Sequence, residues 1–144
     1  MLPVQYQDET YDVHFTALFS TRKDAVPIVC IHGWPGCFLE FLPIMDRLQS
    51  KYPDTLPYHF IALSIPGYTF SSGPPLAHDF TTLDAAKIFS QVLSDLGMTN
   101  YIVSAGDIGS RIARALAVTD SICAALHLNF CADSPMLSYP RLDL

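Results

Sequence analysis

Apolar, strand-like runs recur four times along the chain. They occupy residues 28–32, 58–64, 101–105 and 124–130. The run at 28–32 is unbroken and β-rich, which is typical of a strand buried on both faces of a parallel sheet. A looser alternation over residues 12–19 predicts one further strand, at the edge of a sheet.

Segments with helical spacing separate these runs. Residues 38–50 carry apolar side chains at the spacing of one helix face, with a proline early enough to be tolerated. Thr81 and Asp84 resemble a capping box, so a second helix is expected to follow Thr81 and to end at Leu96, before Gly97. A third helix is predicted over residues 108–118. The buried stripe of the second helix is expected to be Ile88, Val92, Leu93 and Leu96.

The alternation of strands and helices indicates an α/β fold with a doubly wound, mainly parallel sheet and right-handed crossovers. A length of 144 residues suits one domain, so residues 1–144 are expected to form a single unit without an internal linker. In such sheets, ligands bind beyond the carboxyl ends of the strands. The turns after residues 28–32 and 101–105 are therefore the places to look for chemistry.

Composition narrows the classes of partner. The net charge of −6 argues against nucleic-acid binding, which needs clustered Lys and Arg. The uncharged stretch 25–39 is broken by prolines and glycines, so it does not predict a membrane helix. Polar and acidic residues soon follow Met1, which does not resemble a signal peptide, and a cytoplasmic location is expected.

The apolar share of 50% is high for a soluble domain of this size. It fits either a well-buried parallel sheet or a fragment whose missing part would cover apolar surface. The four cysteines lack the paired spacing of a zinc site and are interpreted as small buried free thiols. No metal or cofactor is expected.

The turn Ala105-Gly106-Asp107-Ile108-Gly109 is open to two interpretations. Asp107 can be the N-cap of the helix that follows. Alternatively, the small residues make room for a nucleophile elbow, a sharp strand-to-helix turn that exposes a catalytic side chain. A carboxylate at this position can attack an electrophilic carbon and needs no base to deprotonate it at neutral pH.

The same turn allows a third interpretation. Residues 104–109 nearly fit the dinucleotide fingerprint G-x-G-x-x-G, and Asp133 could stand for its ribose-binding acid. However, Ser104 replaces the first glycine, which makes the tight turn. The elements upstream are also unexplained, because this fingerprint usually opens the sheet.

The segment His32-Gly33-Trp34-Pro35-Gly36 follows the first buried run. It can be a tight turn capped by a histidine, or the loop of an oxyanion hole. Enzymes with a nucleophile elbow build that hole from a backbone N–H of such a loop and the N–H after the nucleophile, here Trp34 and Ile108. The presence of both motifs is a stronger indication than either one.

These motifs, together with residues 37–41, 65–71 and 127–129, resemble the epoxide hydrolases of the α/β-hydrolase fold, especially fungal members of the microsomal-type branch. The resemblance covers residues 12–136 and corresponds to the N-terminal half of such an enzyme. It implies that Asp107 is the nucleophile and that the backbone amides of Trp34 and Ile108 form the oxyanion hole. The supporting loop residues are then His32, Gly33, Pro35, Gly106 and Gly109.

Haloalkane dehalogenases share the fold and the Asp nucleophile. They usually carry a polar residue directly after the His-Gly pair and a Trp after the nucleophile. Trp34 and Ile108 occupy these positions here, which favours the epoxide hydrolases.

The resemblance also implies that several parts of the family's enzymes are expected to be absent from this chain. In the family, the relay acid and the water-activating histidine lie far downstream of the nucleophile, and a cap domain holds the tyrosines that protonate the epoxide oxygen. The N-terminal extension of the microsomal-type branch is likewise expected to be missing. The expected fold is therefore a partial one, without the cap or the last strands.

The resulting hypothesis is an epoxide hydrolase-like protein. Its ancestral reaction adds water to a small apolar epoxide and gives a vicinal diol through an Asp107 ester, and this reaction is expected to be impaired here because general acid–base groups are missing. The alternative is an inactive fragment or pseudoenzyme. The run 124–130 is expected to leave an exposed apolar sheet edge through which copies could associate.

Overall fold

The computed structural model of the chain describes residues 1–77 and 79–131, and a five-stranded sheet is its centre. The strands, in spatial order, are β3 (Phe15–Leu18), β5 (Tyr58–Leu63), β4 (Val26–Ile31), β6 (Tyr101–Gly106) and β7 (Cys123–Cys131). β3 pairs antiparallel with β5, and all other neighbours are parallel. The predicted mainly parallel sheet is therefore confirmed.

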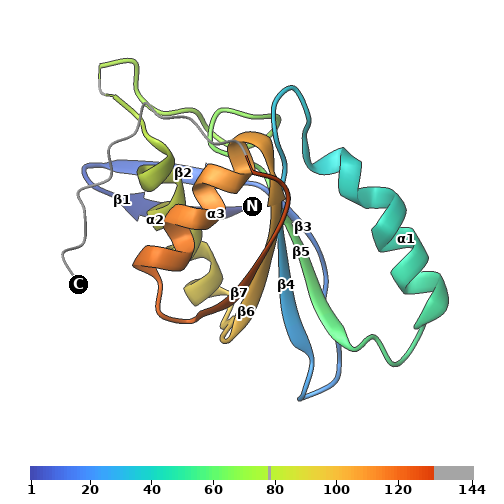
Figure 1. Cartoon of the computed structure of the whole chain (residues 1–144). Helices are drawn as coiled ribbons and strands as arrows, with labels where there is room; N and C mark the ends of the chain where they lie inside the picture. Colours follow the sequence, from blue (N-terminus) through green and yellow to red (C-terminus); the bar gives the residue numbers. More distant parts are fainter. Residues whose placement is uncertain (78, 132–144) are drawn as a thin grey trace.

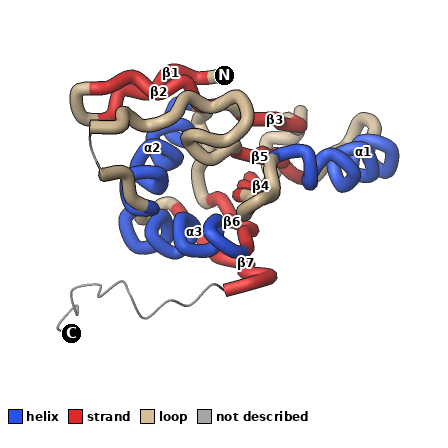
Figure 2. Tube along the Cα trace, turned by 90° about the horizontal axis from the view of Figure 1, so that it is seen from above, coloured by secondary structure: helices blue, strands red, loops and turns tan. Residues whose placement is uncertain are grey.

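Helices cover both faces of this sheet (Figure 1). The view from above places α1 (Leu42–Lys51) on one side and α2 (Thr82–Asp95) with α3 (Asp107–Thr119) on the other (Figure 2). A separate antiparallel hairpin, β1 (Leu2–Tyr6) and β2 (Glu9–Val13), contacts α2, where the Tyr6 hydroxyl donates to Asp84 Oδ1 over 2.7 Å. The doubly wound arrangement matches the sequence-based expectation.

The larger hydrophobic core lies between the sheet and the α2–α3 layer. In α2 the stripe residues Ile88, Val92 and Leu93 are fully buried, and Leu96 packs against them while partly exposed. Each fully buried side chain of this size contributes about 1.5–3 kcal/mol. A smaller cluster beneath α1 contains Cys30, Met45, Phe60 and Ala62.

The ends of α2 follow the predicted signals. Thr81 and Asp84 form a complete capping box. Gly97 has a φ of 69°, and the N–H groups of Gly97 and Met98 donate to the carbonyls of Ser94 and Leu93. This is the hydrogen-bond pattern of a Schellman motif, which requires a left-handed residue that glycine supplies without strain.

The N-terminal part differs from the prediction, because the single edge strand expected over residues 12–19 is divided at His14. Its backbone N–H donates to Ser71 Oγ and its carbonyl accepts from Ser64, each over 2.9 Å. The first bond links His14 to the loop after β5, and the second continues the β3–β5 register by one pair, so the chain changes partner at His14. As a result β2 pairs with β1, whereas β3 pairs with β5.

The segment predicted as one helix over residues 38–50 begins with a short 3₁₀ turn, η1 (Phe38–Phe41), and continues as α1. Pro43 falls within the first turn of α1. Proline lacks an N–H and fits this position, where backbone donors have no partner within the helix. The structure therefore delays the α-helix by one short turn.

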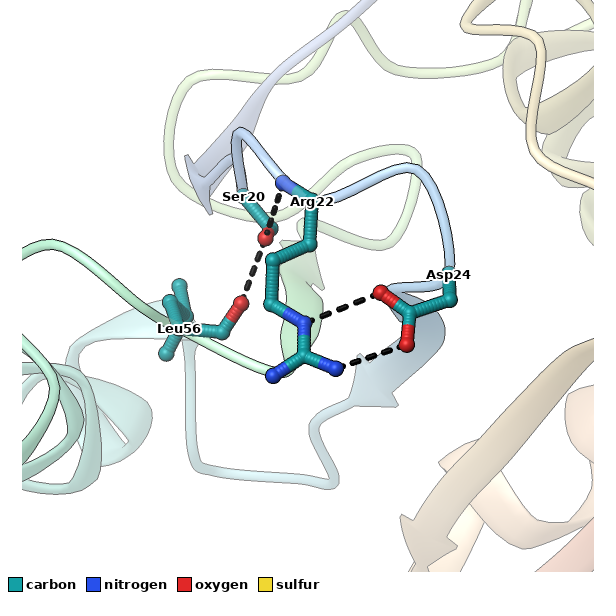
Figure 3. Close-up of polar contacts among 4 residues, drawn as sticks. All are labelled: Ser20, Arg22, Asp24 and Leu56. Carbon is teal, nitrogen blue, oxygen red and sulfur yellow. Dashed lines mark hydrogen bonds and ion pairs between the residues drawn. The ribbon is translucent and has the colours of Figure 1, made fainter.

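The loop before β4 lies at the amino end of the strand, opposite the carboxyl edge (Figure 3). Arg22 Nε and Nη2 donate to the two carboxylate oxygens of Asp24 over 2.9 and 2.6 Å, and Ser20 Oγ donates to the carbonyl of Leu56. Both charged side chains are exposed, so the ion pair adds little to stability.

The four cysteines are free, but only Cys30 is buried, and burial raises the pKa of its thiol to about 12. Cys131 is exposed at the end of β7, contrary to the expectation of buried thiols, because β7 is the outer strand of the sheet. Within residues 1–77 and 79–131, no helix is long and apolar enough to cross a membrane. The same residues contain no cluster of metal-binding side chains.

Candidate active site

The two sequence motifs meet at the carboxyl edge of the sheet. β4 and β6 are parallel neighbours in which Ile31 lies opposite Ala105, so the turns that follow these residues lie side by side. Between them is an open pocket of about 330 Å³. Gly33, Trp34 and Pro35 line it from one turn, Gly106 and Asp107 from the other, and Asn129 and Phe130 from the end of β7.

Asp107 is held in an unusual backbone conformation. Its φ is 52°, in the left-handed region that non-glycine residues rarely occupy. Such a conformation costs of order 1–3 kcal/mol and is typical of functional sites. The N-cap of α3 is Gly106, and no side chain caps the helix, so the interpretation of Asp107 as an N-cap is wrong.

Small residues make this turn possible. A Cβ on Gly33 would lie 2.7 Å from Asp107 Cβ, and one on Gly106 would overlap the side chain of Asn129. A Cβ on Gly109 would lie 2.5 Å from the carbonyl oxygen of His32 and 2.7 Å from that of Ile31. Gly109 therefore lets the first turn of α3 approach the end of β4.

The Asp107 carboxylate lies against backbone amides. The N–H of Trp34 donates to Asp107 Oδ1 over 2.9 Å. This bond, together with the backbone of Ile108 and the charge of Arg111, lowers the pKa of Asp107 below its ordinary value. The carboxylate is therefore ionised at neutral pH, and the Trp34 amide holds its Oδ1.

His32 lies beneath the pocket and is fully buried. Its Nδ1 lies 3.0 Å from the carbonyl oxygen of Gly33, and its Nε2 accepts from the N–H of Ile65 over 3.1 Å. Burial lowers its pKa, so the ring is neutral. It connects the loop after β4 to the loop after β5, and both ring nitrogens are occupied.

The remaining predicted positions are also located. Pro35 lines the pocket after a cis Trp34–Pro35 peptide, and the Trp34 side chain is 70% exposed. Ser104 lies within β6, where its Oγ is 2.9 Å from His127 Nδ1, rather than at a glycine-like tight turn. Asp133, considered as a ribose-binding acid, lies outside the described residues.

Motif reasoning assigned no role to Glu40, Asn129 or Phe130, which the structure places in the pocket wall. Asn129 is part of the family resemblance, and both Asn129 and Phe130 belong to the run predicted as a sheet edge, but neither prediction gives them a role. Their signal was present, because β7 is parallel to β6 and its carboxyl end must reach the same edge of the sheet.

Comparisons with known proteins identify the fold family of the chain. The family model for the alpha/beta hydrolase fold matches residues 26–138, and the model described as "Epoxide hydrolase N terminus" matches residues 2–41. The second match shows that residues 2–41 resemble part of the N-terminal segment of this family.

Individual relatives point to the same group. A Dothistroma septosporum protein with the provisional name epoxide hydrolase is 43% identical over 137 residues, which cover 94% of this chain and 33% of the relative. Epoxide hydrolase 1 of Sus scrofa is 34% identical over 84% of this chain and 28% of its own length.

The solved structure of Aspergillus niger epoxide hydrolase superimposes with a TM-score of 0.83 and 46% identity, covering 97% of this chain and 36% of that one. The chain thus spans about a third of the length of the relatives it matches. It belongs to the α/β-hydrolase fold family, in the epoxide hydrolase group.

Proposed function

We propose that this chain supplies the nucleophile and the oxyanion hole of an epoxide-opening site. The observation that carries the proposal is the 2.9 Å hydrogen bond from the Trp34 N–H to Asp107 Oδ1. The acceptor, Asp107, is held at a positive φ. A carboxylate with one oxygen fixed by backbone amides presents its other oxygen in a defined direction. This is the preorganisation that nucleophilic catalysis needs.

In the first step, the second carboxylate oxygen of Asp107 attacks an epoxide carbon. A carbon–oxygen bond of the three-membered ring breaks, and the resulting alkoxide takes a proton from solvent. Because the pKa of Asp107 is lowered, the nucleophile is ionised throughout the neutral range. The product is an alkyl ester on Asp107.

In the second step, water attacks the ester carbonyl. Negative charge then develops on the oxygen that the Trp34 and Ile108 amides face, and such donors stabilise it. Removing a single donor of this kind typically costs about 10²–10³ in rate. The same amides that orient the carboxylate in the first step thus act on the oxyanion in the second.

Turnover by this chain is expected to be slow. Within the described residues, neither a histidine nor a tyrosine lines the pocket. General acid and general base groups typically contribute about 10²–10⁴ each, so a pocket without these two residue types is expected to open the epoxide and hydrolyse the ester slowly. This observation also favours the second candidate, a chain that retains the site without catalysis.

The pocket walls indicate the class of substrate. Trp34 and Phe130 are 70% and 60% exposed, and both line the pocket beside Asp107 with Phe41. Exposed aromatic faces next to a reactive carboxylate suit an epoxide with an aryl or other apolar substituent. Styrene oxide is a simple probe of this class.

Intact-protein mass spectrometry after incubation with styrene oxide tests the proposal. The wild-type chain is expected to gain the mass of one epoxide on Asp107, at a rate that does not fall between about pH 8 and about pH 5, because Asp107 stays ionised. Asp107→Asn should form no adduct.

Asp24→Asn, which removes an exposed carboxylate at the opposite end of β4, serves as the control and should react as wild type does. An equal adduct on Asp107→Asn would overturn the assignment of the nucleophile. Many turnovers per chain would instead contradict the expected impairment, whereas a chain that forms no adduct supports the inactive alternative.

A further inference from the structure

Two ionisable side chains line the described part of the pocket, Asp107 and Glu40. The proposed function uses the first and assigns nothing to the second. We propose that Glu40 accepts the proton of the water that hydrolyses the Asp107 ester, and that it therefore acts as the general base within this chain. This inference rests on the proposed nucleophilic role of Asp107.

The backbone directs Glu40 back toward the pocket. Glu40 lies in η1, and its N–H donates to the carbonyl of Cys37 over 3.1 Å. This tight turn folds the side chain over the preceding loop, since a Cβ on Gly36 would lie 2.7 Å from Glu40 Oε2. The missing side chain of Gly36 leaves the space that the carboxylate occupies.

The same loop passes Asp107 at its other glycine. A Cβ on Gly33 would lie 2.7 Å from Asp107 Cβ, and one on Gly36 would lie 3.3 Å from the Gly33 carbonyl oxygen. The loop of residues 33–36 thus contacts both acidic side chains and has a glycine at each contact. Both carboxylates border the same open volume, in which water can reach the Asp107 ester.

The other candidate bases near the pocket are already engaged. His32 is fully buried, and both of its ring nitrogens have backbone partners. The Ser104 hydroxyl lies within hydrogen-bond distance of His127 Nδ1. By contrast, no side chain within residues 1–77 and 79–131 forms an ion pair with Glu40, so its oxygens can accept hydrogen bonds from water.

Water, the Asp107 ester and Glu40 are sufficient for the hydrolysis step. A water oxygen bonds to the ester carbon of Asp107, and its proton passes to Glu40. The tetrahedral intermediate then collapses, the bond from the carbonyl carbon to the alkyl oxygen breaks, and Glu40 returns the proton to the departing alkoxide. The diol leaves, and the carboxylic acid of Asp107 loses its proton to solvent.

A single-turnover experiment separates this step from the first. The wild-type chain is loaded with styrene oxide, the excess is removed, and the adduct is followed by intact mass in ¹⁸O-labelled water. Each hydrolysis then leaves one ¹⁸O atom on Asp107. The readout is the ratio of the adduct's decay rate to its formation rate.

Glu40→Gln is expected to lower this ratio at least tenfold, by an amount on the order of 10² if the base contributes as general bases usually do. Gly36→Ala should lower it in the same direction, because the added methyl group displaces the flexible end of Glu40 and leaves its charge intact. Asp24→Asn is the matched control for loss of an exposed carboxylate and should keep the wild-type ratio.

The outcomes distinguish the two proposals. A wild-type chain that forms no adduct on Asp107 removes the proposed function itself. An adduct that forms on wild type but never decays, or that decays equally fast in Glu40→Gln, leaves the nucleophile in place and overturns the role of Glu40. Circular dichroism of each variant shows that the compared chains are folded.

Discussion

At the scale of single residues, Asp107 and His32 are the central side chains of the candidate site, and both already have backbone hydrogen-bond partners. Asp107 is ionised because backbone amides, rather than a nearby cation, carry most of the interaction. His32 is neutral because it is buried, and it makes two hydrogen bonds to backbone groups. Asp107 is the proposed nucleophile, and His32 supports the loop that carries Trp34.

His32 should make the folded state sensitive to acid. Its pKa is lowered in the folded chain, so the unfolded chain binds more protons as the pH falls. The stability it provides is therefore complete above its ordinary pKa of 6.5 and is lost as the pH falls below that value. His32→Phe leaves the Ile65 N–H without its acceptor and should cost about 1–3 kcal/mol at neutral pH.

Urea unfolding at a series of pH values measures this effect. The His32→Phe variant should lose less stability than wild type between about pH 7.5 and about pH 5. His127→Gln, at an exposed histidine, should stay within about 0.5 kcal/mol of wild type. Parallel pH profiles for wild type and His32→Phe would show that His32 does not titrate on unfolding.

At the scale of elements, the approach of α3 to β4 determines the shape of the turn at Asp107. Gly109→Ala would place a methyl group against two backbone carbonyls, which cannot move as a flexible side chain can. A loss of about 1–3 kcal/mol is expected, together with slower adduct formation. Gly73→Ala is the control, because a Cβ there meets only ordinary contacts, and it should unfold as wild type does.

The sequence predicts some of the strands well and others not at all. The strands β4, β5 and β6 were placed to within one or two residues, because strands buried on both faces leave long apolar runs. The hairpin β1–β2 was missed. Its turn places Gln7 at a φ of 55° without the Asn-Gly or Asp-Gly signal of such turns, and Val4 is the only fully buried residue of β1.

The site shows a similar division. Both turns and their glycines could be predicted because a turn in which two backbone segments come close needs small residues, and these are visible in the local sequence. Glu40 was missed because residues 38–50 were interpreted as one regular helix, in which position 40 faces solvent. In the structure Glu40 is exposed, but it lies in a 3₁₀ turn and borders the open pocket, and Gly36 is informative only once Glu40 is seen to lie over it.

At the scale of the whole molecule, β7 is an edge of the sheet formed by the described residues, as the sequence predicts. Within the described residues it pairs only with β6, and Leu126 and Phe130 are exposed. Its nine residues include no Asp, Glu, Lys or Arg, so its ladder groups on the open side could pair with those of a second copy. The chain is therefore expected to associate as its concentration rises.

Ala125→Lys should reduce this association, because a charge on an edge strand disfavours pairing with another strand. Sedimentation velocity over a range of concentrations measures it. Val118→Lys adds the same charge on α3, away from the edge, and should associate as wild type does. A wild-type chain that stays monomeric at every concentration would contradict the expectation.

The position of β4 between two strands that follow it in sequence also affects how the molecule forms. The His32–Ile65 bond can form once β5 has joined β4, but the Trp34–Asp107 bond spans 73 positions and requires β6 as well. Contacts between residues so distant in sequence are expected to form late in folding, because the chain must first lose the entropy of the loop that joins them. Alkylation of Asp107 would therefore report on folding, since it requires that the centre of the sheet is complete.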